Sequence, residues 1–220
     1  MKFRMFFLVL LLASIRCASP GETNVTFTFS ISFTKEMSEQ AQDGRLLLLV
    51  SANDKAEPRF QINDGLETQL VFGVDVDGMK PGQDILIDQS AFGFPLQSLR
   101  NVPFGEYFIQ VLINRYETYS LKTGHTVKLP PDQGEGQQWH SKPGNFYSKP
   151  QKITLNASKR EIIKVVMDQK IPPIAGPKDT PYVKHIKVQS KLLSEFYGKP
   201  MYVGAHVLLP DGYDEHPQAH

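Results

Sequence analysis

The stretch Val25-Thr26-Phe27-Thr28-Phe29-Ser30-Ile31-Ser32-Phe33-Thr34 alternates strictly between apolar and hydroxyl-bearing side chains. Successive side chains of a β-strand point to opposite faces of a sheet, so this period of two predicts a strand with one buried and one solvated face. A second stretch, Leu46 to Val50, is apolar at every position. That pattern is typical of a strand covered on both faces. Together the two stretches indicate a layered β-structure.

Further short strands are expected along the chain, separated by turns rich in Gly, Pro, Asn and Asp. They are Arg59 to Ile62, Gln69 to Val76, Asp84 to Ile87, Tyr107 to Asn114, His125 to Leu129, Gln151 to Leu155 and Glu161 to Met167. Between them, Pro95 to Arg100 is the only helical turn that the pattern indicates. Many short strands without a long helical period predict an antiparallel sandwich or barrel.

The strand entry Pro103-Phe104-Gly105-Glu106-Tyr107 favours the sandwich. It resembles the Pro-x-Gly-x-Tyr entry of transthyretin-like sandwiches, in which the glycine takes a backbone shape that a side chain would hinder and the tyrosine packs inward. The expected fold class is therefore all-β, with an antiparallel β-sandwich of the immunoglobulin-like or transthyretin-like kind over residues 22–170.

Composition excludes some classes of partner. The 220 residues are 40% hydrophobic and 21% charged, which is typical of a folded globular protein. Lys and Arg number 24 against 23 Asp and Glu, a formal net charge of +1, and no run of basic residues is present. Such a balance gives no field that would concentrate nucleic acid, so no nucleic-acid partner is expected.

The amino terminus indicates export. Lys2 and Arg4 precede the apolar run Met5 to Ile15, which has the length of a signal-peptide core and is shorter than the roughly 20 residues of a membrane span. We expect a signal peptide at residues 1–19, a secreted or periplasmic location and no membrane span.

Cys17 is the only cysteine, so the exported chain has no disulfide and depends on its core for stability. Acylation of Cys17, as in a lipoprotein, is not expected, because Ile15 and Arg16 precede it where lipoprotein signals have small residues. Asn24 and Asn156 lie in glycosylation sequons that a eukaryotic host would use.

A linker follows the sandwich. The segment Ile171 to Pro177 contains three prolines, which remove ladder donors and cannot continue a central strand. New alternating segments follow at Val183 to Gln189 and Met201 to Leu209. We therefore place a linker at 171–181 and a second unit at 182–220.

The second unit contains Phe196-Tyr197-Gly198-Lys199-Pro200 and, after a strand, Leu209-Pro210-Asp211-Gly212-Tyr213. This pattern resembles the entry to the catalytic domain of α/β-hydrolase-fold esterases of the esterase D and enterochelin-esterase-like group. The resemblance implies that residues 182–220 hold the first strands of a truncated α/β-hydrolase domain. No Gly-x-Ser-x-Gly nucleophile elbow occurs in the chain, so no catalytic residue is assigned and the chain alone is expected to be inactive.

A long loop from Pro130 to Pro150 is the candidate ligand site. Its aromatic residues Trp139, His140, Phe146 and Tyr147 can form a platform on which the apolar face of a sugar ring stacks. The same composition also suits a loop that packs back onto the sandwich or against a following domain. Both interpretations stay open at this point.

No metal or cofactor is expected. The six histidines lack the short spacings of metal ligands. Asp75-Val76-Asp77-Gly78 contains part of a calcium-loop pattern, but Met79 and Leu86 occupy two positions that would need oxygen ligands. An Asp-Gly hairpin turn explains the same residues.

Two functions fit these observations. The first is a non-catalytic accessory β-sandwich of a secreted esterase, whose partners are the missing C-terminal hydrolase domain and a glycan or ester substrate. The alternative is a freestanding secreted module that binds glycan or protein through the Trp139 loop.

Overall fold

The computed structural model describes residues 27–65, 68–131, 138–156, 162–213 and 215. The predicted signal peptide, Cys17 and the Asn24 sequon lie outside these residues. Within them the chain is mostly β, with antiparallel sheets and one short α-helix, which confirms the all-β class. No helix in this part of the chain is long and apolar enough to span a bilayer.

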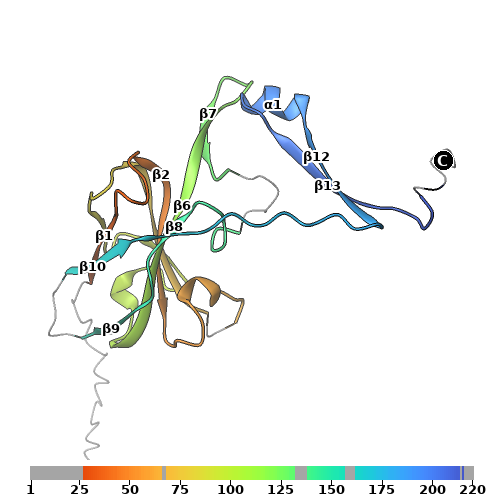
Figure 1. The fold of residues 1–220 in the computed structure, drawn as a ribbon. Helices are drawn as coiled ribbons and strands as arrows, with labels where there is room; N and C mark the ends of the chain where they lie inside the picture. The colour runs from red at the N-terminus through yellow and green to blue at the C-terminus, as the bar shows by residue number, and fades with distance from the viewer. Residues whose placement is uncertain (1–26, 66–67, 132–137, 157–161, 214, 216–220) are drawn as a thin grey trace, which may run out of the picture.

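The described residues contain thirteen strands, which form two packed sheets and a separate hairpin (Figure 1). The smaller sheet has the order β10-β1-β4, and the larger runs β11-β8-β6-β2-β3-β5, with β7 and β9 also paired to β6. The sandwich strands are β1 Thr28–Phe33, β2 Gln42–Ser51, β3 Leu70–Met79, β4 Ile85–Ile87, β5 Phe92–Phe94, β6 Gly105–Ser120, β7 Thr126–Leu129, β8 Phe146–Tyr147, β9 Gln151–Leu155, β10 Ile162–Met167 and β11 Gln169–Lys170.

Strand β1 buries the apolar set that its alternation predicts. Phe27, Phe29, Ile31 and Phe33 all belong to the core between the two sheets. The hydroxyl face is less solvated than expected, because Ser30 is buried as well. β1 pairs antiparallel with β4 but parallel with β10, so the smaller sheet is mixed.

Strand β2 lies between β3 and β6, and both of its faces are covered as predicted. Leu46, Leu48 and Val50 face the main core. Leu47 and Leu49 face outward, where they form a smaller cluster with Leu112 and Ile171. We call this smaller set the outer cluster. Because the side chains of the outer cluster are buried, other parts of the chain must cover the outer face of the larger sheet.

Strand β6 organises the larger sheet. It is 16 residues long and pairs with β2 along one side, while β9, β8 and β7 follow one another along the other. Its last residues, Glu117 to Ser120, pair only with β7 and extend beyond the sheet as an arm (Figure 1).

Some predictions of local secondary structure failed, because contacts made elsewhere in the fold outweigh the apolar pattern of the sequence. The strand expected at Arg59 to Ile62 is wrong, because Pro58–Phe60 forms a 3-10 turn with proline at its start. The helical turn expected at Pro95 to Arg100 is a 3-10 turn at Leu99–Asn101. The short strands β5, β8 and β11 were not predicted, since two or three residues show no periodicity.

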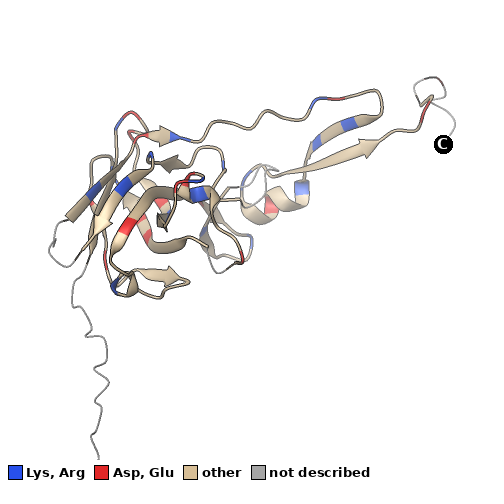
Figure 2. Ribbon diagram, turned by 90° about the horizontal axis from the view of Figure 1, so that it is seen from below, with Lys and Arg blue, Asp and Glu red and all other residues tan. Residues whose placement is uncertain are grey.

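The C-terminal unit is a hairpin that projects from the sandwich (Figure 2). Strands β12 Val183–Gln189 and β13 Tyr202–Leu208 pair with each other over seven residue pairs and with no other described strand. Helix α1, Lys191–Tyr197, connects them; its N-cap Ser190 accepts a hydrogen bond from the Leu193 amide, and Gly198 ends it in the left-handed conformation. No described residue after Ile171 is buried.

Helix α1 fastens the hairpin to the arm of β6 and β7. The amide of Lys122 donates to the carbonyl of Phe196 at 2.8 Å, and the Tyr119 and Tyr197 rings meet edge to face at 5.6 Å. The Lys199 ammonium donates to Glu117 at 2.5 Å and lies over the Tyr119 ring. The linker is fastened at its start, where the Ile171 amide and carbonyl bond to Asn145 and Gly144.

Candidate functional site

The four predicted ligand-binding residues do not share one surface. Phe146 and Tyr147 are neighbours in β8, so their side chains point to opposite faces of the sheet. Phe146 is 0% exposed and packs in the main core against Phe33. Tyr147 and Trp139 pack against the outer cluster, and His140 lies edge to face with Trp139. Trp139, His140 and Tyr147 therefore gather on the outer face, whereas Phe146 has no surface to offer a ligand there.

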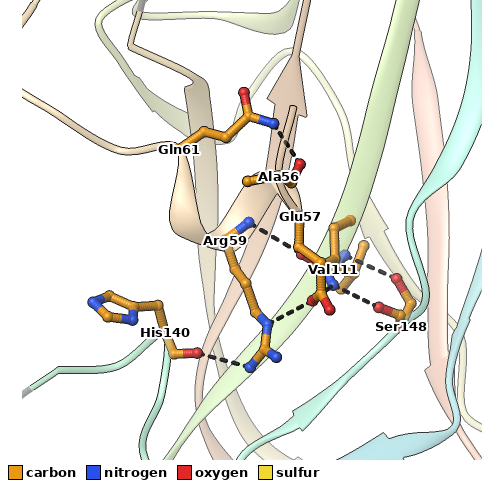
Figure 3. Close-up of polar contacts among 8 residues, drawn as sticks. Ala56, Glu57, Arg59, Gln61, Val111, His140 and Ser148 are labelled. Atoms are coloured by element: carbon orange, nitrogen blue, oxygen red, sulfur yellow. Dashed lines mark hydrogen bonds and ion pairs between the residues drawn. The ribbon is translucent and has the colours of Figure 1, made fainter. Parts of the chain in front are cut away.

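His140 and Tyr147 contact a buried arginine that the sequence did not single out. Arg59 is 9% exposed, and its guanidinium lies over the rings of Phe60 at 4.3 Å and Tyr147 at 4.2 Å. Its Nε donates to Glu57 Oε2 at 2.7 Å and its Nη1 to the His140 carbonyl at 2.9 Å. Figure 3 shows Arg59 between Glu57 and His140, which approach it from different segments.

Gln110 links this arrangement to the centre of the sheet. It is fully buried on β6, where its Oε1 accepts from the Arg59 amide at 3.0 Å. Its Nε2 donates to Glu57 Oε2 and to the Ser148 carbonyl, both at 2.9 Å. Ser148 Oγ in turn accepts from the Val111 amide at 3.0 Å (Figure 3). We call Glu57, Arg59, Gln110, His140, Tyr147 and Ser148 the Arg59 cluster.

The charges in this cluster are satisfied internally. Burial by itself raises the pKa of Glu57, but hydrogen bonds from Gln110 and Arg59 outweigh it and the net pKa is below its ordinary value. Burial, with a smaller contribution from the Arg59 charge, lowers the pKa of His140. His140 Nδ1 is buried without a hydrogen-bond partner among the described residues.

The Arg59 cluster thus fastens two loops to β6 with paired charges and stacked rings. The described residues of the Trp139 loop pack back onto the sandwich, which is one of the two alternatives, since Trp139 and Tyr147 cover the outer cluster. The Phe60 ring beside His140 is the most exposed of these rings, at 49%, whereas Trp139, His140 and Tyr147 are partly buried.

A second candidate site is a cleft between the sandwich, the linker and the hairpin. It has a volume of about 970 Å³. Arg115, Tyr116 and Glu117 of β6 line one side, the linker from Ile171 to Pro177 another, and His185, Lys187, Tyr202 and His206 of the hairpin the third. Ligand sites commonly form between such units.

His185, on the hairpin side of this cleft, contacts both Asp179 of the linker and His206 of the opposite strand. His185 and His206 are directly opposite in the β12–β13 register, and their ring centroids are 4.6 Å apart. Asp179 Oδ1 lies 3.0 Å from His185 Nδ1 and also accepts from the His185 amide at 2.9 Å. These hydrogen bonds lower the pKa of Asp179. Asp179 therefore fixes the orientation of His185 and ties the linker to the hairpin.

This grouping does not by itself provide catalysis. Among the described lining residues there is no serine, threonine or cysteine that His185 could activate. No group of three potential metal ligands occurs in the described part of the chain. At the partial calcium motif, Asp75 pairs with Arg45 at 2.8 Å and Asp77 pairs with Lys128, so both carboxylates are engaged in ion pairs on β3.

Neither Arg59 nor the histidine pair could be identified from local sequence patterns, and the reason is the same for both. Arg59 lies inside a segment expected to be a strand, and its partners are up to 81 positions away. His185 and His206 meet only through the register of a hairpin. Aligning the two predicted C-terminal strands as a hairpin was the one step that could have placed His185 opposite His206.

Comparison with known proteins finds no matching family model, no similar curated protein and no similar solved structure.

Proposed function

We propose that this chain is the non-catalytic β-sandwich region of a secreted esterase-like hydrolase, in which the β12–β13 hairpin begins a catalytic domain. The observation behind this proposal is the lack of buried residues in the hairpin. An isolated two-stranded hairpin is at best marginally stable in water, so such a hairpin is expected to form part of a larger sheet or layer.

One face of the hairpin has the character of an interior surface. Ile186 and Val188 are 46% and 53% exposed, and the cross-strand register places Ala205 and Val203 opposite them. A contiguous apolar face of this kind marks an interaction surface. Leu192 of α1 is also exposed and adds to the apolar area that a following domain would cover.

The open edges of the hairpin fit the same role. Neither β12 nor β13 pairs with another described strand, so each offers an unpaired row of backbone donors and acceptors. In the proposed protein, strands of the hydrolase sheet continue from one of these edges. The sandwich then acts as a scaffold that holds this sheet and orients substrate.

Hydrogen exchange on the chain alone and on a longer product that includes the proposed catalytic domain tests this proposal. We expect β12 and β13 amides to exchange rapidly in the chain alone and to be protected when the following domain is present. The chain alone should not hydrolyse p-nitrophenyl acetate above buffer, whereas the longer product should. Strong protection of the hairpin in the isolated chain, or hydrolysis by the isolated chain that a serine-directed inhibitor abolishes, would contradict the proposal.

The alternative of a freestanding glycan-binding module is favoured by one observation, the exposed Phe60 ring beside His140 and Trp139. Trp139 is the only tryptophan, so its fluorescence reports on this surface directly. A saturable change on titration with a neutral oligosaccharide, lost on Phe60→Ala, would favour this alternative over the accessory role.

A further inference from the structure

The walls of the 970 Å³ cleft hold cations from three separate elements. Arg115 comes from β6, Lys170 from β11 and Lys187 from β12. Carboxylates of the described residues do not form an ion pair with any of the three. The described acidic residue that lines the cleft, Glu117, is already bonded to Lys199. Among the described residues that line the cleft, cationic side chains therefore outnumber carboxylates.

Arg115 is the most confined of these cations. Its Nε donates to the neutral Gln42 Oε1 at 2.5 Å and its Nη1 to the Gly144 carbonyl at 2.9 Å, while the guanidinium lies over the Phe146 ring. Burial lowers the pKa of Arg115, and the more distant Glu117 charge offsets this only in part. A partly buried cation without a carboxylate partner is stabilised when an anion binds beside it.

The cleft also has flat apolar surfaces. The Tyr116 and Tyr202 rings and the linker prolines Pro172 and Pro173 contribute to its lining. Lys187 lies 5.2 Å above the Tyr202 ring, which places a positive charge next to one of these surfaces. Rings and prolines suit the apolar face of a pyranose, and the adjacent cations suit an acidic substituent on it.

We propose that this cleft binds an acidic saccharide, with its carboxylate or sulfate between the side chains of Arg115, Lys170 and Lys187. Both anchors of the hairpin support a preformed site, because the linker is bonded at Ile171 and α1 is bonded to the arm. This site uses only residues of the present chain, so it does not depend on the proposed catalytic domain. It is also separate from the Trp139 surface.

Calorimetric titration of the full chain tests the proposal with three tetrasaccharides of galactose units: uncharged, carboxylated and sulfated. We expect an acidic tetramer to bind roughly tenfold more tightly than the uncharged one, and binding to weaken as salt rises from about 50 to about 200 mM. Preference for the carboxylated or for the sulfated tetramer then identifies which anion the cleft accepts.

The double variant Lys170→Gln, Lys187→Gln locates the site. It should lose roughly tenfold in affinity for the acidic tetramer, while its thermal unfolding stays unchanged because both side chains are exposed. The matched control is Lys152→Gln, which removes a lysine of β9 that pairs with Glu106 outside the cleft. Equal binding of charged and uncharged tetramers, no binding of any, or equal affinity of the double variant and the control would overturn the proposal.

Discussion

At the scale of single residues, Arg59 is a buried charge that needs several partners. Taking a guanidinium out of water is unfavourable unless its charge and its donors are matched, and here a carboxylate, a carbonyl and two rings match them. The His140 carbonyl and the Tyr147 ring come from a stretch of chain far from Arg59 in the sequence, so these contacts hold that stretch against the turn at residues 57–60. Because the buried charge must keep these partners, the chain around residues 57 and 140 is held in a defined conformation.

Replacing Glu57 with Gln tests this account. The variant leaves Arg59 buried without its anion, which we expect to lower the free energy of unfolding by about 1–2 kcal/mol, less than for a fully buried pair because Glu57 retains some exposure. Glu106→Gln, which breaks the exposed pair with Lys152, should change it by less than about 0.5 kcal/mol. Urea denaturation at pH 7 compares the two. Equal effects would mean that the Arg59 pair contributes no more than a surface pair.

His140 gives a pH-dependent prediction. Its pKa is lowered in the folded protein, mainly by burial, so the unfolded chain binds more protons between the folded value and the unfolded value near 6.5. Stability contributed by neutral His140 is therefore present above about pH 6.5 and decreases as pH falls through that window. His140→Gln should show a smaller loss of stability over the same interval. An NMR titration of the ring with a midpoint at or above 6.5 would contradict this assignment.

At the scale of elements, packing determines which side chains of strand β5 face the core, and the sequence pattern does not. A Cβ on Gly93 would lie 2.4 Å from the Phe72 ring and 2.3 Å from the Leu96 carbonyl oxygen, so only glycine fits between β5 and the core. Since alternate residues face opposite ways, Phe92 and Phe94 then point outward, with exposures of 71% and 61%. An apolar pattern alone would have placed these two rings inside.

Gly93→Ala should therefore be destabilising by about 1–3 kcal/mol, because backbone and a core ring must both move to admit one methyl group. Gly176→Ala is the matched control, since nothing lies within 4 Å of its added Cβ and we expect almost no change in stability. Thermal unfolding of both variants provides the measurement. A Gly93→Ala protein as stable as the control would show that β5 is free to shift.

Prediction from sequence succeeded where the local pattern of apolar residues determines which side chains of a strand are buried. The alternation of β1 and the apolar run of β2 identified both strands and the apolar residues they bury, but not the buried Ser30; β12 and β9 were predicted with the observed bounds. It failed at Arg59, where ion pairing and a proline outweigh the strand pattern. Short strands such as β5 depend on their neighbours in the sheet, and no local signal exists for them.

The candidate site was less predictable than the fold. Aromatic content pointed to the Trp139 loop, but which ring faces which way follows from the β8 pairing and not from composition. Similarly, the cations of the cleft come from β6, β11 and β12, which are brought together by the pairing of β8 with β6 and β11 and by the anchored hairpin. Long-range placement of isolated charges has no periodicity that a single sequence could reveal.

At the scale of the whole molecule, the sandwich and the hairpin differ in what stabilises them. The sandwich has a main core and an outer cluster, whereas the hairpin contributes no buried residue and contacts the sandwich chiefly through α1. The boundary of the self-sufficient unit is not at the end of β11, because Ile171, the next residue, is buried against Leu47, Leu49 and Leu112.

Two truncations place that boundary. Ending the chain at Pro177 keeps Ile171 and removes the hairpin, so we expect a cooperative thermal transition within about 2–4 °C of the full chain. Ending it at Lys170 exposes the outer cluster, and the loss should approach the roughly 2–5 kcal/mol typical of deleting a buried isoleucine side chain. Calorimetry of the two shortened chains makes the comparison. If both unfold alike, Ile171 does not complete the core; if the Pro177 chain fails to fold, the hairpin is part of the sandwich and the accessory-module proposal is wrong.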